Sequence, residues 1–168
     1  MLAYHPMFDP YHCSLRLMCI LYDSNRPSLE WDRLRLLDFF VTFPHQLAQM
    51  KLPAEFRNRR KMLSAIPEPY ETLPSPARLF FQLGEIQEAA ARVLAVKEFI
   101  DGDELLKGTA AISKSAVMQP LMQIGDRLQY RSTSWYEFVV KDLSEIALQG
   151  SKGLKERSGV MEFRHDPI

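Results

Sequence analysis

The sequence predicts a mainly α-helical protein with a small β component, that is, an α+β fold. Apolar residues recur at helical spacing through three long segments, and two of these segments begin with a capping residue followed by proline. The stretches that are typical of strands are short: "GTAAIS" at 108–113 and "VMEF" at 160–163. With 168 residues, of which 46% are hydrophobic, the chain is long enough to bury a core.

The first helix is expected to begin at Asp9-Pro10, because aspartate is a favoured N-cap and proline suits the first helical position. The residues that follow, "YHCSLRLMCILYDS", are apolar almost all round, which predicts a mostly buried helix. The pattern breaks near 23–27, "DSNRP".

The second helix is expected to take Ser28 as its N-cap, with Glu30 and Asp32 in the first turn, where the helix dipole favours acidic residues. Residues 29–43, "LEWDRLRLLDFFVTF", carry two apolar stripes. Pro44 then stops or bends this helix.

A basic segment, residues 51–61, precedes a Pro-rich segment, residues 67–76. The basic segment carries five basic side chains against the single acidic Glu55. Prolines at 67, 69, 74 and 76 exclude a regular helix, so we expect an extended chain there. We expect one domain, 1–168, in which the Pro-rich segment is either a strap across the domain or an internal boundary.

Ser75-Pro76 repeats the cap-and-proline start, and the apolar spacing predicts a long helix over 76–97. Asp101-Gly102 predicts a turn before the first short strand. A helix followed by a strand and a turn is compatible with a winged-helix module, with strand or hairpin elements after residue 98 and near the C-terminus.

Two further helices are expected in the last third of the chain. One covers about 116–130, and the other follows Ser134, which forms a capping-box pattern with Glu137. The glycine-rich tail that begins at Gly150 then leads to the expected closing strand.

The opening stretch "YHPMFDPYHC", residues 4–13, concentrates side chains that could bind a metal. Its spacing matches no zinc pattern such as C-x2-C or H-E-x-x-H, and Asp9 is already engaged as a helix cap. We therefore favour a structural motif and expect no metal; a metal or catalytic site and a partner-binding surface are the alternatives. The residues of this N-terminal motif are Tyr4, His5, Asp9, Pro10 and His12.

The sequence contains no catalytic signature that we could identify. G-x-S-x-G is absent, and the glycines of "GSKGLK" at 150–155 follow a helix, whereas a phosphate loop lies between a strand and a helix. We therefore expect no catalytic residue, no cofactor and no enzyme activity, and we favour a binding or scaffolding role.

Two basic groups are candidate contacts to a partner or to nucleic acid. For the group at 57–61 the alternatives are a solvated face, a phosphate-contacting patch and a contact to an acidic partner. For the group at 152–157 the alternatives are a tight loop and a docking loop. A formal net charge of zero argues against a small non-specific DNA-binding protein. The groups are Arg57, Arg59, Arg60 and Lys61, and Lys152, Lys155 and Arg157.

The cysteine content and the hydropathy pattern bear on the compartment. Two cysteines, Cys13 and Cys19, do not make a disulfide framework and agree with a reducing environment. No stretch approaches the roughly 18 apolar residues of a membrane helix. We expect a cytoplasmic protein without a membrane partner.

Three segments together resemble a known family: "YHPMFDPYHCSLRLMCIL" at 4–21, "LEWDRLRLLDFFVTFP" at 29–44 and "GLKERSGVMEFR" at 153–164. They are similar to the middle component of bacterial ABC-three-component systems, of the Lamassu type that defends against phages and plasmids. The resemblance implies a small accessory subunit that binds no nucleotide. It also implies two partners, an SMC-like or Rad50-like ATPase and an effector, often a nuclease, with foreign DNA sensed through the complex.

Two other hypotheses compete with this adaptor role. A stand-alone winged-helix DNA-binding protein would use the helix at 76–97 for recognition, although its Arg78, Gln82, Gln87 and Arg92 are few for that task. A metal-dependent enzyme would use His5, Asp9, His12 and Cys13.

Overall fold

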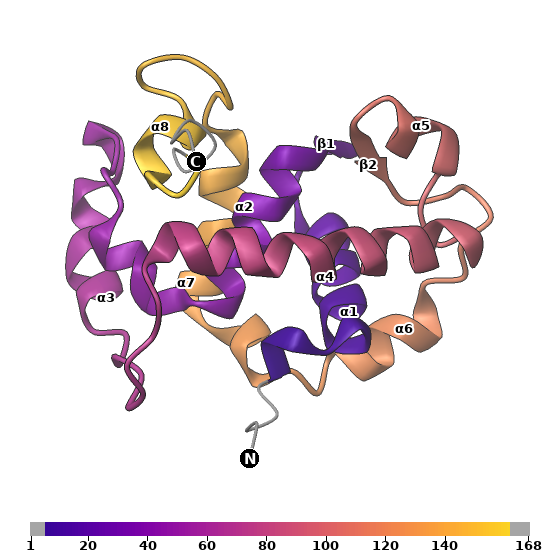
Figure 1. The fold of residues 1–168 in the computed structure, drawn as a ribbon, viewed down its shortest axis with the longest axis horizontal. Coiled ribbons are helices and arrows are strands. Elements are labelled where there is room, and N and C mark those ends of the chain that lie inside the picture. The colour runs from indigo at the N-terminus through magenta and orange to yellow at the C-terminus, as the bar shows by residue number, and fades with distance from the viewer. Residues whose placement is uncertain (1–5, 162–168) are drawn as a thin grey trace.

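Helices make up most of the structure, a computed structural model that describes residues 6–161 (Figure 1). The prediction of a mainly α-helical fold with a small β component is confirmed. The two strands, β1 (Ser28–Glu30) and β2 (Thr109–Ala111), form one antiparallel sheet. The helices are α1 (Pro10–Asp23), α2 (Trp31–Thr42), α3 (Arg60–Ser64), α4 (Pro76–Val96), α5 (Gly102–Leu106), α6 (Gln119–Gly125), α7 (Ser134–Glu137) and α8 (Leu154–Ser158).

The three longest helices build the centre of the core. Helix α4 runs across α1 and α2, and all three contact one another (Figure 1). Phe39 of α2 meets Phe80 of α4 edge to face at a centroid distance of 5.8 Å, and it meets Phe40 at 5.4 Å. Helix α1 adds Leu17 and Ile20, which are fully buried as the all-round apolar pattern predicts. Burial of these side chains is the main stabilising contribution.

The helix starts at Asp9 and Ser75 are confirmed. The Asp9 Oδ1 atom accepts a hydrogen bond from the Tyr11 backbone N–H at 2.8 Å, with Pro10 as the first helical residue. The Ser75 Oγ atom accepts one from the Arg78 N–H at 3.4 Å. These local signals work because a cap needs only side chains within three residues of the helix start.

The expected Ser28 cap is wrong. Ser28 is the first residue of β1, where it lies opposite Ala111, and α2 begins only at Trp31. Glu30, which precedes Trp31, makes no side-chain cap. The partner of β1 is β2, which lies about eighty residues later in the sequence, so a local pattern does not reveal this pairing.

The strand expected after residue 98 exists as β2, but it does not form a local hairpin. Within residues 6–161 its strand partner is β1, and a single further bridge joins Ile100 to Ile112. The Asp101-Gly102 turn instead starts α5, since the Asp101 Oδ1 atom accepts from the N–H groups of Asp103 and Glu104 at 3.0 and 3.1 Å. A wing next to α4 is therefore absent from the part of the chain that the structure describes.

The last third is more irregular than the pattern predicts. Helix α6 covers only part of 116–130 and is followed by the 3-10 helix Gln129–Ser132. The cap of α7 is Thr133 rather than Ser134, because the Thr133 Oγ1 atom accepts from the Tyr136 N–H at 3.2 Å. The chain then continues as the π-helix Phe138–Asp142 and the 3-10 helix Leu143–Glu145.

The tail forms α8 where a tight loop was expected. Val160 and Met161 of the expected closing strand are not in a strand, and the remainder of that stretch lies outside the described residues. The Pro-rich segment 67–75 is without regular structure, as predicted. Buried core residues lie on both sides of it, such as Leu63 and Leu79; its role as strap or boundary stays a prediction.

Candidate functional site

The two predicted basic groups lie at the same end of the molecule. Figure 1 shows α3 and α8 together at the left end of the long axis. The Lys51 backbone N–H donates to the Arg157 carbonyl at 3.2 Å, and the Arg157 Nη1 group donates to the Lys51 carbonyl at 3.0 Å. These bonds join segments that are about one hundred residues apart. We call the surface formed by residues 51–61 and 152–157 the basic end.

Four of the seven predicted contacts are used inside the molecule. Arg60 donates to the carbonyls of Ala48 and Met50 at 2.7 and 3.2 Å. Arg157 also donates from Nε to the Lys152 carbonyl at 2.6 Å. The other two form ion pairs, Arg59 with Asp142 at 3.3 Å and Lys155 with Asp32 at 2.6 Å. These side chains stabilise the local backbone first, whatever they bind.

The remaining three cations are exposed: Arg57, Lys61 and Lys152. Their side chains make no ion pair or hydrogen bond within residues 6–161. A cation that forms no ion pair within its own chain is available to bind an acidic group of another molecule. Of the seven predicted contacts, these three are not used within the described residues.

An apolar groove lies toward the other end of the molecule, between the start of α1, the end of α4 and α6 (Figure 1). Its volume is about 380 Å³. Three apolar side chains are unusually open to solvent: Tyr11 is 82% exposed, Ile124 53% and Val93 41%. The floor and walls are Leu15, Leu94, Phe99 and Leu121, and the polar lining residues are Asp9, His12, Ser14 and Lys97.

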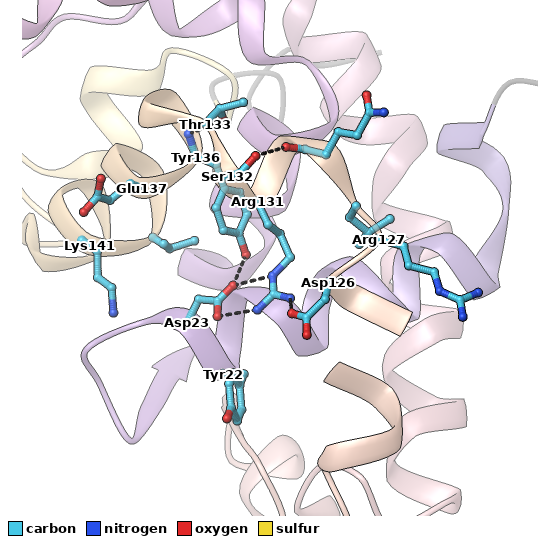
Figure 2. A pocket seen from close by; sticks show the side chains of 13 residues that line it. Tyr22, Asp23, Asp126, Arg127, Arg131, Ser132, Thr133, Tyr136, Glu137 and Lys141 are labelled. Carbon is cyan, nitrogen blue, oxygen red and sulfur yellow. Dashed lines mark hydrogen bonds and ion pairs between the residues drawn. The ribbon is translucent and has the colours of Figure 1, made fainter. Parts of the chain in front are cut away.

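A second cavity, of about 800 Å³, contains a cluster of polar side chains and lies where the end of α1 meets the residues around α7 (Figure 2). At its centre the Asp23 carboxylate accepts from Arg131 Nε at 2.9 Å and from Arg131 Nη2 at 2.7 Å. The Tyr136 hydroxyl donates to the same carboxylate at 2.8 Å. Arg131 Nη1 reaches Asp126 at 2.9 Å. This bidentate geometry is the strongest form of an arginine–carboxylate pair.

The polar groups at the centre of this cavity satisfy one another. The hydrogen bond to Asp23 raises the pKa of Arg131, and burial raises the pKa of Tyr136, so the guanidinium stays charged and the phenol neutral. The lining carries three acidic and three basic side chains, which leaves it without a net charge to select an anion: Asp23, Asp126, Glu137, Arg127, Arg131 and Lys141. The cluster therefore ties α1 to the last third of the chain.

The comparison with protein families decides the identity. The family model of "ABC-three component (ABC-3C) system Middle Component 5" matches residues 2–166, nearly the whole chain. The chain belongs to this family. The resemblance of the three sequence segments to a middle component is thereby confirmed, while the Lamassu type stays a prediction. Comparison with curated proteins and with solved structures finds no match.

Membership in the ABC-3C Middle Component 5 family makes the chain an accessory subunit of a multi-component system. The described residues contain no helix whose length and apolar character would let it cross a membrane. Neither observation tests the cytoplasmic location, which stays a prediction.

The opening stretch of this middle component is partly described. Asp9 is the cap of α1, Pro10 its first residue, and His12 is exposed at the apolar groove. Burial raises the pKa of the Cys13 thiol, which keeps it protonated. Tyr4 and His5 lie outside the described residues. Within 6–161 no group of three or more histidine, cysteine, aspartate or glutamate side chains is placed to hold a metal.

Of the four candidate recognition residues on α4, one is buried and a second is paired on the same helix. Gln87 of α4 is fully buried, and its side chain donates to Asp38 at 2.8 Å and to the Arg35 carbonyl at 3.1 Å. Arg92 is exposed and pairs with Glu88 on the same helix at 3.6 Å. This use of the α4 side chains argues against base recognition by that helix.

A buried polar network was missed by sequence reasoning. Asp38 has no solvent exposure and accepts from Arg16 Nε at 2.7 Å as well as from Gln87. Arg35 donates to the Gln87 side chain at 3.2 Å and lies over the Phe80 ring. The sequence signal for this network was a single charged residue within an otherwise apolar helix stripe, because a charge that is buried in such a stripe is paired.

Proposed function

We propose that this middle component is a non-enzymatic adaptor of a Lamassu-type defence system. In this proposal it bridges an SMC-like or Rad50-like ATPase and an effector nuclease, so that detection of foreign DNA by the complex releases the effector. The observation that carries the proposal is the position of two chemically different surfaces, the basic end and the apolar groove, toward opposite ends of the long axis (Figure 1).

Two separate surfaces suit a bridging subunit. An adaptor holds two partners at once, so its contacts need to be far enough apart for both to bind without collision. The exposed cations Arg57, Lys61 and Lys152 suit an acidic surface, and the groove suits apolar side chains. Different chemistry at the two ends also keeps each partner from binding at the wrong place.

The proposal that the subunit is not an enzyme is supported by the way the polar groups of the cavity around Asp23 are used. The carboxylate of Asp23 is already engaged by Arg131 and Tyr136. A general base or nucleophile needs a group that can reach a substrate in the correct protonation state. This cluster instead links chain segments. DNA is then contacted through the partner ATPase, and we place the complex in the cytoplasm.

Co-expression tests the proposal. This chain alone carries an affinity tag and is expressed with the two proteins encoded beside it, followed by size-exclusion chromatography and mass spectrometry. We expect it to elute with a large coiled-coil ATPase and a second protein. Elution of the tagged chain by itself as a stable monomer would contradict the adaptor function.

A further inference from the structure

We infer that the apolar groove binds an amphipathic helix of a partner subunit, with apolar side chains on one face and acidic residues beside them. This inference deepens the adaptor function and rests on it, because it gives one of the two partners a place and a chemistry. The groove is formed by Tyr11 and Leu15 of α1, Val93 of α4, Phe99, and Ile124 of α6.

Of the ten large apolar side chains that are exposed within the described residues, three line this groove. Tyr11, Val93 and Ile124 come from three different helices and are each more than 40% exposed. Val96, one turn beyond Val93 on α4, is 83% exposed and continues the same face. Single exposed apolar residues are ordinary, but a contiguous set around a depression marks an interaction surface.

The charges at the rim indicate the chemistry of the occupant. Lys97 and His12 line the groove, and neither side chain makes an ion pair or hydrogen bond within residues 6–161. The Asp9 carboxylate, also in the lining, is engaged by the backbone at the start of α1. The start of α1 offsets the charge of Asp9, whereas Lys97 has no partner within residues 6–161, so an acidic residue next to an apolar helix face complements the groove.

The backbone holds Lys97 at this rim at some cost. Glu98 has φ of 60°, a left-handed conformation that is unfavourable for a side chain other than glycine. It ends α4 by a turn in which the Phe99 N–H donates to the Leu94 carbonyl at 2.9 Å. The residues on either side of Glu98, Lys97 and Phe99, both line the groove. Strained backbone positions often occur where the chain presents a functional side chain.

The size of the groove favours one face of a helix. A volume of about 380 Å³ accepts a few large side chains, such as those at successive turns of an amphipathic helix, rather than a folded surface. The membership of the chain in a three-component system supplies separate subunits that could carry such a helix.

The test uses the co-expressed complex, with the tag on this chain. We expect Ile124→Asp and Lys97→Glu each to reduce the recovery of one partner by about tenfold, because the first removes an apolar contact and the second reverses the charge at the rim, while the other partner is retained. Tyr11→Ala adds a variant that changes a largely exposed side chain and leaves the core intact. Leu106→Asp is the matched control, since Leu106 is 88% exposed and lies outside the groove.

The outcomes separate this inference from the adaptor function. If the wild-type complex forms and all three groove variants bind both partners as Leu106→Asp does, the groove inference is wrong and the adaptor function stands. If the untagged neighbours never co-elute with the wild-type chain, both fail. If the isolated chain is a dimer that Ile124→Asp dissociates, the occupant is a second copy of the chain, which overturns the inference.

Discussion

The basic end consists of charged side chains and the apolar groove of hydrophobic ones, and the two surfaces differ in how many of these side chains remain available for binding. At the basic end, Arg60 and Arg157 hold backbone carbonyls, and Arg59 and Lys155 are ion-paired, so fewer than half of the predicted contacts are available. In the groove, the apolar side chains of Tyr11 and Ile124 remain open to solvent, at 82% and 53% exposure. A count of charged residues in the sequence therefore overestimates the number of side chains available at a binding surface. The apolar spacing of a helix does not show which apolar side chains stay exposed.

The largest expected effect comes from the buried network around Asp38, which joins α1, α2 and α4. Helices α1 and α4 carry the groove, and both are tied to Asp38 of α2 through Arg16 and Gln87. Asp38→Ala leaves the Arg16 charge buried without its partner, so we expect the free energy of unfolding to fall by about 3–5 kcal/mol in urea denaturation.

The control is another arginine–aspartate pair at the surface. Asp142→Ala removes the partner of Arg59, whose side chain is 45% exposed, so its loss is expected to stay below about 1 kcal/mol. Equal losses in the two variants would show that the buried Asp38 network contributes no more stability than an exposed ion pair.

A smaller effect separates the two classes of cation at the basic end. Arg157→Ala removes hydrogen bonds to the carbonyls of Lys51 and Lys152, and we expect it to lower the free energy of unfolding by about 1.5 kcal/mol. Lys152→Ala, in the turn before α8, is expected to stay within about 0.5 kcal/mol. If urea denaturation reversed this order, the division into internal and available cations would be wrong.

At the end of the molecule that carries the groove, Asp9 has a structural role comparable to that of Arg157 at the basic end. Asp9→Ala removes the N-cap of α1 and is expected to cost about 1 kcal/mol, measured by thermal or urea denaturation. Tyr11→Ala, two residues later, is the control, because Tyr11 is exposed and caps nothing. Unchanged stability of Asp9→Ala together with the loss of a bound metal would replace the structural interpretation by a metal site.

The smallest expected effect is on the pH dependence of the free energy of unfolding, and it involves Glu30, between the two ends of the molecule. The hydrogen bond from Arg33, at 2.7 Å, lowers the pKa of Glu30 to about 2 from its ordinary 4.5. A lowered pKa in the folded state means that this contribution to stability is present above pH 4.5 and is lost as the pH falls toward 2.

Glu30→Gln should therefore be less sensitive to acid than the wild type over this range. Urea denaturation at several pH values checks it, and the difference is expected to be modest because the Glu30 side chain is 42% exposed. Identical pH profiles for the two proteins would contradict the lowered pKa.

Local signals predicted the helices well and the surfaces poorly. Asp9 and Ser75 mark helix starts because a cap and its N–H partner are neighbours in sequence. The strand at Ser28 was missed because its partner, Ala111, is distant in the chain. The division of the region after Ser134 into α, π and 3-10 segments follows from its tertiary packing, which apolar spacing alone does not encode.

The candidate sites show the same limit. The sequence identified the cations of the basic end, but their use depends on distant groups such as the Lys51 carbonyl for Arg157. The groove was not predicted, because the apolar spacing of the expected helices does not distinguish Val93 and Ile124 from apolar side chains that become buried. An apolar stripe wider than the available core leaves some residues exposed, and only the packing decides which.

The most direct test of the bridging role compares one variant from each end in the co-expressed complex. Arg57→Glu, Lys61→Glu and Lys152→Glu are combined in one chain, because none of these side chains holds the fold, and Ile124→Asp is made in another. The bridging account predicts that each variant loses a different partner and retains the other. Loss of the same partner from both variants, or of neither, would contradict it.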